Sequence, residues 1–152
     1  MIQTKTIFQV VGAILGALVA LFAVAIGIAI DKGTLAGPVL WRFPQDYRGW
    51  VIMEFENPRC QPLARDRLYM VIPIAASGRG CTSTQFLEGW RYTQYRYIDS
   101  QGRETKLRAD GWNTNSTVWP LSTSLEKKQW YLFVGTQGEL SRSWGSRPDR
   151  SP

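Results

Sequence analysis

A hydrophobic run near the N-terminus constrains the structure of this chain more than any other feature. Residues 7–30 read IFQVVGAILGALVALFAVAIGIAI, and from residue 10 onward every side chain in the run is apolar. As a helix rising about 1.5 Å per residue, residues 10–30 span roughly 31 Å, which matches the hydrocarbon core of a bilayer. Soluble helices are rarely apolar on all sides over this length. We therefore predict a transmembrane helix, acting as a signal anchor, over residues 7–30.

The same run has a second interpretation, as a signal peptide that is removed. The basic residue Lys5 precedes it, and the small residues Gly27 and Ala29 are compatible with a cleavage site. The hydrophobic region of a signal peptide usually has about 7–15 residues, which is shorter than this run. We expect the run to be retained, and release of a secreted soluble protein after cleavage is the alternative.

The charges that flank the run indicate its orientation. Lys5 lies on the N-terminal side without an acidic neighbour, whereas Asp31 and Lys32 follow the run. Basic residues favour the cytoplasmic side, so residues 1–6 are predicted to be a short cytoplasmic N-terminus. The expected location is the cell membrane, in a single pass, with the C-terminal domain periplasmic or extracellular.

Small residues recur four apart within the run, at Gly12, Gly16 and Ala20. Such spacing lets two helices approach closely in a bilayer, so these residues predict helix packing in a homodimer. The alternative is that glycine and alanine are simply common in membrane spans. Besides the lipid bilayer, the expected partner is therefore a second copy or another protein in a membrane complex.

The composition of the remaining chain limits its chemistry. About 120 residues follow the run, enough for one domain with one core. The chain has no histidine, which removes the Ser-His and Cys-His nucleophile pairs and the commonest zinc ligand, so we expect no metal and no cofactor. The net charge of +6 fits binding to acidic ligands, but it equally serves solubility.

Alternation of apolar and polar residues predicts strands through the rest of the chain. Val51, Met53 and Phe55 share one face of a strand, and Pro73 should place another strand at a sheet edge or end it. A turn at residues 99–102 should join two strands in a hairpin. The predicted strands cover residues 49–56, 68–74 (with Leu68, Met70, Ile72 and Ile74 aligned), 90–98, 104–108 and 129–134.

Short strands separated by turns, without an amphipathic helix, predict a mainly β fold. We expect an antiparallel β-sandwich or barrel-like domain over residues 41–140. Residues 31–40, which contain GTLAGP, should form a linker. Residues 141–152 are polar and contain proline, so we expect a disordered tail.

The two cysteines each follow a predicted strand, which would bring them together. A disulfide between Cys60 and Cys81 is the natural product outside the cytoplasm. Closing a loop of about twenty residues would stabilise the fold by roughly 3 kcal/mol. Two buried free thiols are the alternative.

One predicted strand interleaves aromatic rings with arginines. This composition binds sugar rings or single-stranded nucleic acid, but a sheet also uses it for cross-strand and cation–π pairing. Because the domain is expected outside the cytoplasm, a glycan, a peptide or a lipid headgroup is the expected ligand, and nucleic acid is not. The candidate ligand surface comprises Trp90, Arg91, Tyr92, Tyr95, Arg96 and Tyr97.

Two patterns suggest catalysis, and both occur by chance. Glu54 and Glu56 share a strand face about 7 Å apart, as paired carboxylates do in inverting glycoside hydrolases, yet the solvent face of any amphipathic strand looks the same. Ser124 and Lys127 match S-x-x-K without the other elements of that machinery. We therefore expect no catalytic residue, and a hydrolase of envelope glycans is the alternative.

A series of short motifs resembles a known family in its order along the chain. The motifs are Phe43-Pro44, Tyr47-Arg48-Gly49-Trp50-Val51, Asn57-Pro58, Pro62-Leu63, Cys81-Thr82-Ser83-Thr84, Tyr97-Ile98-Asp99 with Gly102, and Val134-Gly135-Thr136. Together they resemble an uncharacterised bacterial family of membrane-anchored or lipoprotein-like β domains, over about residues 41–136. The resemblance implies a β-rich fold in the bacterial envelope and carries no known activity. The expected function is a binding or structural module of the cell envelope.

Overall fold

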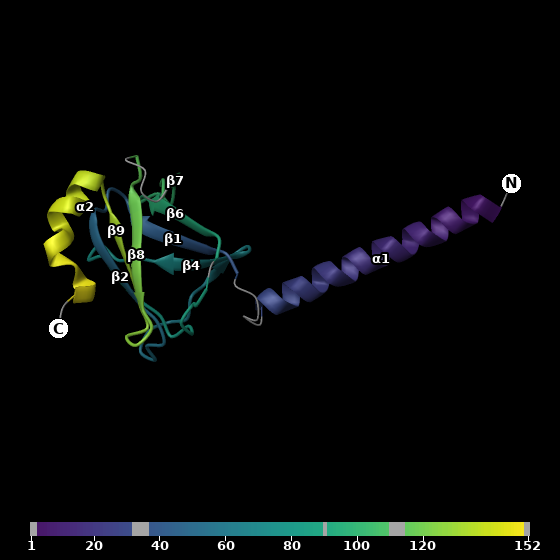
Figure 1. Cartoon of the computed structure of the whole chain (residues 1–152), viewed down its shortest axis with the longest axis horizontal. Coiled ribbons are helices and arrows are strands. Elements are labelled where there is room, and N and C mark those ends of the chain that lie inside the picture. Colours follow the sequence, from purple (N-terminus) through teal and green to yellow (C-terminus); the bar gives the residue numbers. More distant parts are fainter. Residues whose placement is uncertain (1–2, 32–36, 90, 110–114, 151–152) are drawn as a thin grey trace. The chain divides into compact units, whose positions relative to one another are not determined.

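The structure is a computed structural model that describes residues 3–31, 37–89, 91–109 and 115–150. The chain divides into two compact units, Met1–Gly37 and Pro38–Pro152, which are described separately. Figure 1 shows the first as a single helix and the second as a β domain.

The N-terminal unit contains α1 (Gln3–Asp31), a helix of 29 residues that includes the predicted range. Its described apolar side chains are exposed, from 38% at Ile26 to 70% at Phe22. No helix in the part of the chain that the structure describes has both the length and the apolar character of a membrane span. A Cβ added at Gly12 or Gly16 would meet nothing within 4 Å, and pairing through Gly12, Gly16 and Ala20 stays a prediction.

The β domain consists of two sheets, built from nine strands within the described residues. The five-stranded sheet has the order β3 (Arg65–Asp66), β4 (Tyr69–Pro73), β1 (Val39–Pro44), β6 (Thr93–Ile98), β7 (Glu104–Lys106). The four-stranded sheet has the order β5 (Arg79–Cys81), β2 (Gly49–Glu54), β9 (Gln129–Val134), β8 (Val118–Ser124). The mainly β prediction is therefore confirmed.

Both sheets are mixed, so the expectation of an antiparallel domain is wrong. β1 runs parallel to β4 and β6, and β2 runs parallel to β5. The reason lies in the connections: after β1 the chain crosses to the other sheet as β2 and then returns to place β4 beside β1. Such crossovers generate parallel pairs, which a two-residue hairpin cannot do.

The five predicted strand ranges contain β2, β4, β6, β7 and β9. β4 ends at Pro73, as predicted, because proline has no backbone N–H to donate to a neighbouring strand. Leu68 was predicted to share a strand face with Met70, and this is wrong. It lies in the turn before β4, after Arg67 (φ 56°), and its side chain is 68% exposed. Four of the nine described strands lie outside the predicted ranges: β3, β5, β8, and β1, which begins at Val39 inside the expected linker.

The hairpin between β6 and β7 is confirmed. The two strands pair antiparallel, and the backbone N–H of Gly102 (φ 77°) donates to the carbonyl of Asp99 at 3.0 Å. Asp99 Oδ1 accepts from the backbone N–H groups of Gln101 and Arg103, both at 2.9 Å. The aspartate side chain thus fixes the turn that the sequence placed here.

The disulfide between Cys60 and Cys81 is present, with their Cα atoms 5.8 Å apart. It joins the segment after β2 to the end of β5. Next to it, the buried Thr82 hydroxyl donates to the carbonyl of Gln61 at 2.9 Å. The segment after β2 is therefore held by a covalent bond and by hydrogen bonds.

The hydrophobic core lies between the two sheets. Val51, Met53 and Phe55 are buried as their alternation predicts, at 0%, 0% and 2% exposure. Trp41 on β1 lies at the centre of an aromatic group, with ring centroids 6.1 Å from Phe43 and 5.8 Å from Trp130. Large aromatic side chains thus connect the two sheets.

The end of the chain is helical instead of disordered, which corrects the expectation for residues 141–152 over its described part. It consists of α2 (Gln137–Ser143), η1 (Trp144–Ser146) and η2 (Pro148–Arg150). Thr136 caps α2: its Oγ1 accepts from the N–H of Glu139, whose carboxylate accepts from the N–H of Thr136. This capping box lies just before the predicted tail and satisfies otherwise unpaired donors.

Packing against the four-stranded sheet explains why this polar segment is ordered. Leu140 of α2 is 5% exposed and contacts Trp119 and Phe133 on the outer face of that sheet. The indole N–H of Trp50 donates to the carbonyl of Ser143 at 3.3 Å. Figure 1 shows α2 beside β2 and β9. The segment is polar in composition, but its few apolar side chains pack against tryptophans of the sheet. These contacts keep the segment ordered.

Candidate functional site

One end of the space between the sheets is hollow. The cavity there has a volume of about 810 Å³. We call it the inter-sheet cavity. Its lining is mostly apolar and comes from β1, β6, β8, β9 and the loop before β6. The main apolar lining residues are Trp41, Phe86, Leu87, Tyr95, Pro120, Leu121, Leu125, Trp130 and Leu132.

Strand alternation explains how side chains are assigned to this cavity. On β6, Tyr95 and Tyr97 both belong to the hydrophobic core, but Tyr95 lines the cavity and Tyr97, two residues on, does not. On β9, Leu132 and Val134 are both core residues, and Leu132 alone of the two lines the cavity. Residues two apart share a sheet face, so each strand passes from the hollow part of the interior into the filled part.

An irregularity in β8 shapes one wall of the cavity. The pairing of β8 with β9 shifts register between Pro120 and Ser122. Such a bulge adds an unpaired residue and bends the strand. Beyond the bulge Thr123 is paired with Trp130, and both line the cavity.

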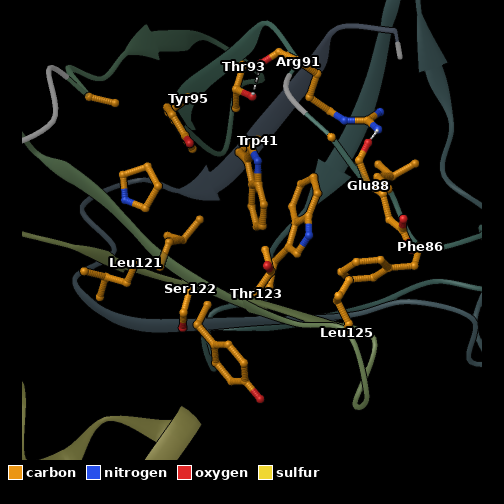
Figure 2. Close-up of a pocket in the computed structure, with 17 residues that line it drawn as sticks. Trp41, Phe86, Glu88, Arg91, Thr93, Tyr95, Leu121, Ser122, Thr123 and Leu125 are labelled. Atoms are coloured by element: carbon orange, nitrogen blue, oxygen red, sulfur yellow. Dashed lines mark hydrogen bonds between the residues drawn. The ribbon is translucent and has the colours of Figure 1, made fainter. Parts of the chain in front are cut away.

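Aromatic rings form the middle of the cavity. Figure 2 shows Trp41 pointing from β1 toward the strand that carries Ser122 and Thr123. The Trp41 ring centroid lies 6.3 Å from that of Tyr95. Burial raises the pKa of Tyr95 to about 12, so its phenol is neutral at physiological pH. The centre of the cavity therefore carries no charge.

Among the described residues that line the cavity, Arg91 is the one cation. One of its terminal nitrogens donates to the backbone carbonyl of Glu88 at 2.5 Å (Figure 2). Its Nε is buried and has no hydrogen-bond partner in the described part of the chain. Burial lowers the pKa of Arg91, although a guanidinium remains charged at any physiological pH. Glu88, the one acid in the described lining, is exposed.

The structure does not bring the predicted ligand surface together on one face. Tyr95 and Arg91 line the cavity, whereas the hydroxyl of Tyr97 is used inside the fold and donates to the carbonyl of Tyr47 at 2.8 Å. Tyr92 is 63% exposed, and Arg96 lies on the outer face of the five-stranded sheet. The period of two in a strand separates these neighbours. Trp90 lies outside the described residues.

Arg96 belongs to an ionic network on that outer face. Glu104 accepts from Arg96 at 2.5 Å and from Arg42 at 2.6 Å, and Arg42 also donates to Asp66 at 2.6 Å. Burial alone would raise the pKa of Glu104, but hydrogen bonds from Arg96 and Arg42 outweigh it and lower that pKa. The network connects β3, β1, β6 and β7, so these ion pairs have a structural role in the five-stranded sheet.

The two catalytic patterns have structural uses. β2 ends at Glu54, and Glu56 has a left-handed backbone (φ 58°), so the two carboxylates do not share one continuous strand. Glu56 Oε1 accepts from the backbone N–H of Phe86 at 3.0 Å. Ser124 Oγ accepts from the N–H of Lys127 at 3.1 Å in the turn after β8. Among the described residues, no group of three or more His, Cys, Asp or Glu could hold a metal ion.

Four aromatic residues that line the cavity were not among the predicted ligand residues: Trp41, Phe86, Trp130 and Tyr131. Trp41 and Trp130 occupy inward positions of β1 and β9, where an apolar residue is expected for the core alone. A large aromatic residue at an alternating position is the one local signal they give. It does not distinguish a filled interior from a hollow one.

Comparisons with known proteins identify relatives of this chain. A crystal structure described as that of a "Putative Lipoprotein from Bacillus anthracis" has a similar fold, with a TM-score of 0.56 and 20% sequence identity. The match covers 75% of this chain and 79% of that one. No curated protein matches the sequence. A family of unknown function (DUF6843) matches residues 39–139, more than half of the chain and slightly more than the range of the predicted resemblance. The chain is therefore a member of this family, as its motifs predicted.

Proposed function

We propose that this protein is a non-catalytic module of the cell envelope, anchored by α1, that binds a small ligand in the inter-sheet cavity. The size and the apolar lining of this cavity are the main support for a binding function. Its volume of about 810 Å³ lies within the range of about 300–1,000 Å³ for small-molecule sites. Such sites are mostly apolar with a few polar groups, as this lining is.

The exposed apolar side chains of α1 support the anchor. Val11, Leu18 and Phe22 are among nine large hydrophobic residues of α1 with exposed side chains, and a patch of this kind on a soluble protein is unusual. Residues 10–30 contain no charged side chain. The free energy of transferring them from water into lipid becomes more favourable with every apolar group. A single pass with the N-terminus inside follows from the flanking charges.

Two observations support a location outside the cytoplasm. A disulfide persists mainly in oxidising compartments, and Cys60 and Cys81 form one. The structure with a similar fold is described as a lipoprotein, a class of protein held at a membrane. In this chain the hydrophobic helix would replace the lipid anchor.

A neutral diazirine photolabel tests both parts of the proposal in native membranes. We expect two groups of labelled peptides: α1, because it lies in lipid, and the cavity lining around β8 and β9. A Thr123→Trp variant should lose the second group alone, since the larger side chain fills the cavity. Equal labelling of β8 and β9 in both proteins would contradict the binding function, and unlabelled α1 would contradict the anchor.

Protease treatment of intact spheroplasts tests the orientation. A C-terminal tag should be digested, because the β domain is expected outside, and a protected tag would overturn that location. The intact mass of the mature chain separates the anchor from a cleaved signal peptide. A mature chain that starts near residue 30 would support the secreted alternative.

A further inference from the structure

We propose that the ligand of the inter-sheet cavity is a single-chain amphiphile with a carboxylate head, such as a long-chain fatty acid, whose head pairs with Arg91. This inference rests on the proposed binding function and adds the chemical class of the ligand. It follows from three features of the lining: one incompletely paired cation, few free polar groups, and a large apolar surface.

The guanidinium of Arg91 is prepared for an anion. Within the described residues its Nε is buried without a partner, and its terminal nitrogen donates to the backbone carbonyl of Glu88 and not to a carboxylate. A buried donor without a partner is rare, because it has lost its hydration. A carboxylate supplies the missing acceptor, and the planar fork of arginine matches it with two parallel hydrogen bonds.

The charges of the lining limit the head to a single negative charge. Of the lining residues that the structure describes, Arg91 is the one cation and Glu88 is the one acid. A ligand with several negative charges would pair one and leave the others against apolar walls and an acid. A carboxylate meets this limit better than a phosphate, which carries up to two charges at neutral pH.

The remaining lining favours an acyl chain over a sugar. Three of the five side-chain hydroxyls among the described lining residues already donate inside the protein. Thr93 donates to the carbonyl of Arg91 at 3.2 Å, Ser122 to Asp149 at 2.9 Å, and Tyr131 to Gln129 at 2.5 Å. A sugar would need partners for many hydroxyl groups, since buried polar groups are rarely left unpaired. The rings of Trp41 and Trp130 can bury methylene groups without such partners.

A photoreactive fatty acid tests this inference on the full chain in lipid nanodiscs. The probe is a sixteen-carbon fatty acid with a diazirine in its chain, and the matched control is the alcohol of equal length. We expect the acid to label peptides around residues 86–95 and 120–132 far more than the alcohol does. Both should label α1 equally, which provides an internal standard for partitioning into lipid.

Matched arginine variants connect the labelling to Arg91. Arg91→Met should weaken labelling of the cavity peptides by the acid about tenfold to a hundredfold, the value of one charged hydrogen-bonded pair. Arg91→Lys should restore part of it. Arg96→Met is the control, because Arg96 also has a buried Nε without a partner among the described residues but lies on the outer face of the sheet. This variant should leave the labelling of the cavity peptides by the acid unchanged.

The outcomes separate this inference from the proposed function. Equal labelling by acid and alcohol, unchanged in Arg91→Met, would overturn the carboxylate head while supporting a binding cavity. Absence of cavity labelling by either probe would overturn this inference, and the neutral photolabel then decides whether the cavity binds at all. Circular dichroism of each variant, showing an unchanged spectrum and a melting temperature well above that of the labelling, excludes loss of folding as the cause.

Discussion

The filled and hollow parts of the interior differ although the same strands build both. In the filled part, Met53, Val118 and Val134 have no exposed surface. In the hollow part, Trp41, Tyr95 and Trp130 surround a cavity of about 810 Å³. Filled interiors stabilise a fold through contacts that close packing provides. A hollow part contributes less to stability, so its side chains are available for binding.

Truncation in the filled part should have the largest effect on stability. We expect Met53→Ala to lower the free energy of unfolding by about 4 kcal/mol, because the side chain is fully buried and leaves a void. Urea denaturation measures the change. The matched control is Leu125→Ala at the cavity, where the side chain is 60% exposed and the expected change is below about 0.5 kcal/mol. Equal losses in the two variants would remove the distinction between the two parts.

Removal of the disulfide should destabilise the domain without changing its cavity. Replacing Cys60 and Cys81 by serine should cost roughly 3 kcal/mol, because the unfolded chain regains the freedom of a 21-residue loop. Neither cysteine lines the cavity. Thermal unfolding should therefore shift downward, while photolabelling of β8 and β9 below the transition stays unchanged. A loss of that labelling in the folded variant would show that the disulfide shapes the cavity.

Acid should weaken the support behind one cavity wall. Asp149 accepts from Arg147 and from Ser122 of β8, and the hydrogen bond from Arg147 is the main reason that its pKa falls from 3.8 to about 2. A lowered pKa means that the charged form stabilises the fold, fully above about pH 4 and progressively less as the pH falls toward 2. Asp149→Asn should lower stability at neutral pH by about 1–2 kcal/mol and by much less near pH 2. A pH-independent difference in melting temperature would contradict this assignment.

The smallest expected effect concerns the helix that covers the four-stranded sheet. Thr136→Ala removes the side-chain acceptor of the capping box and should cost about 1 kcal/mol, measured by urea denaturation. Thr136→Ser keeps a hydroxyl at the same position and is the control. Equal stabilities of the alanine and serine variants would show that the cap does not hold α2.

Local pattern predicted the strands whose apolar residues either alternate clearly or form a short continuous run. β9 has the predicted bounds, since its apolar run is buried from Tyr131 to Val134 and Gly135 ends the strand. β8 was missed because Pro120 and several Ser and Thr residues interrupt its apolar character. The helical end was not predicted because its order depends on Leu140 packing against Trp119 and Phe133 of the four-stranded sheet, a tertiary contact that the local pattern of residues 141–152 does not show.

The order of the strands and the cavity are properties of the tertiary structure. The parallel pairs of β1 with β4 and β6 arise from crossovers, for which no residue of these strands gives a signal. Of the candidate ligand residues, Arg91 and Tyr95 line the cavity and Tyr97 does not, because alternation alone does not show which inward positions border a cavity. The bulge near Pro120 and the loop that carries Arg91 determine where the interior is hollow.

The small molecules that copurify with the chain from native membranes test the central claim most directly. Mass spectrometry of material extracted from the purified wild type should show a single-chain amphiphile in a stoichiometric amount. The Thr123→Trp variant, whose cavity is filled but whose fold and anchor are intact, should lack it. The same extract from both proteins, or no bound molecule in the wild type, would contradict a ligand site between the sheets.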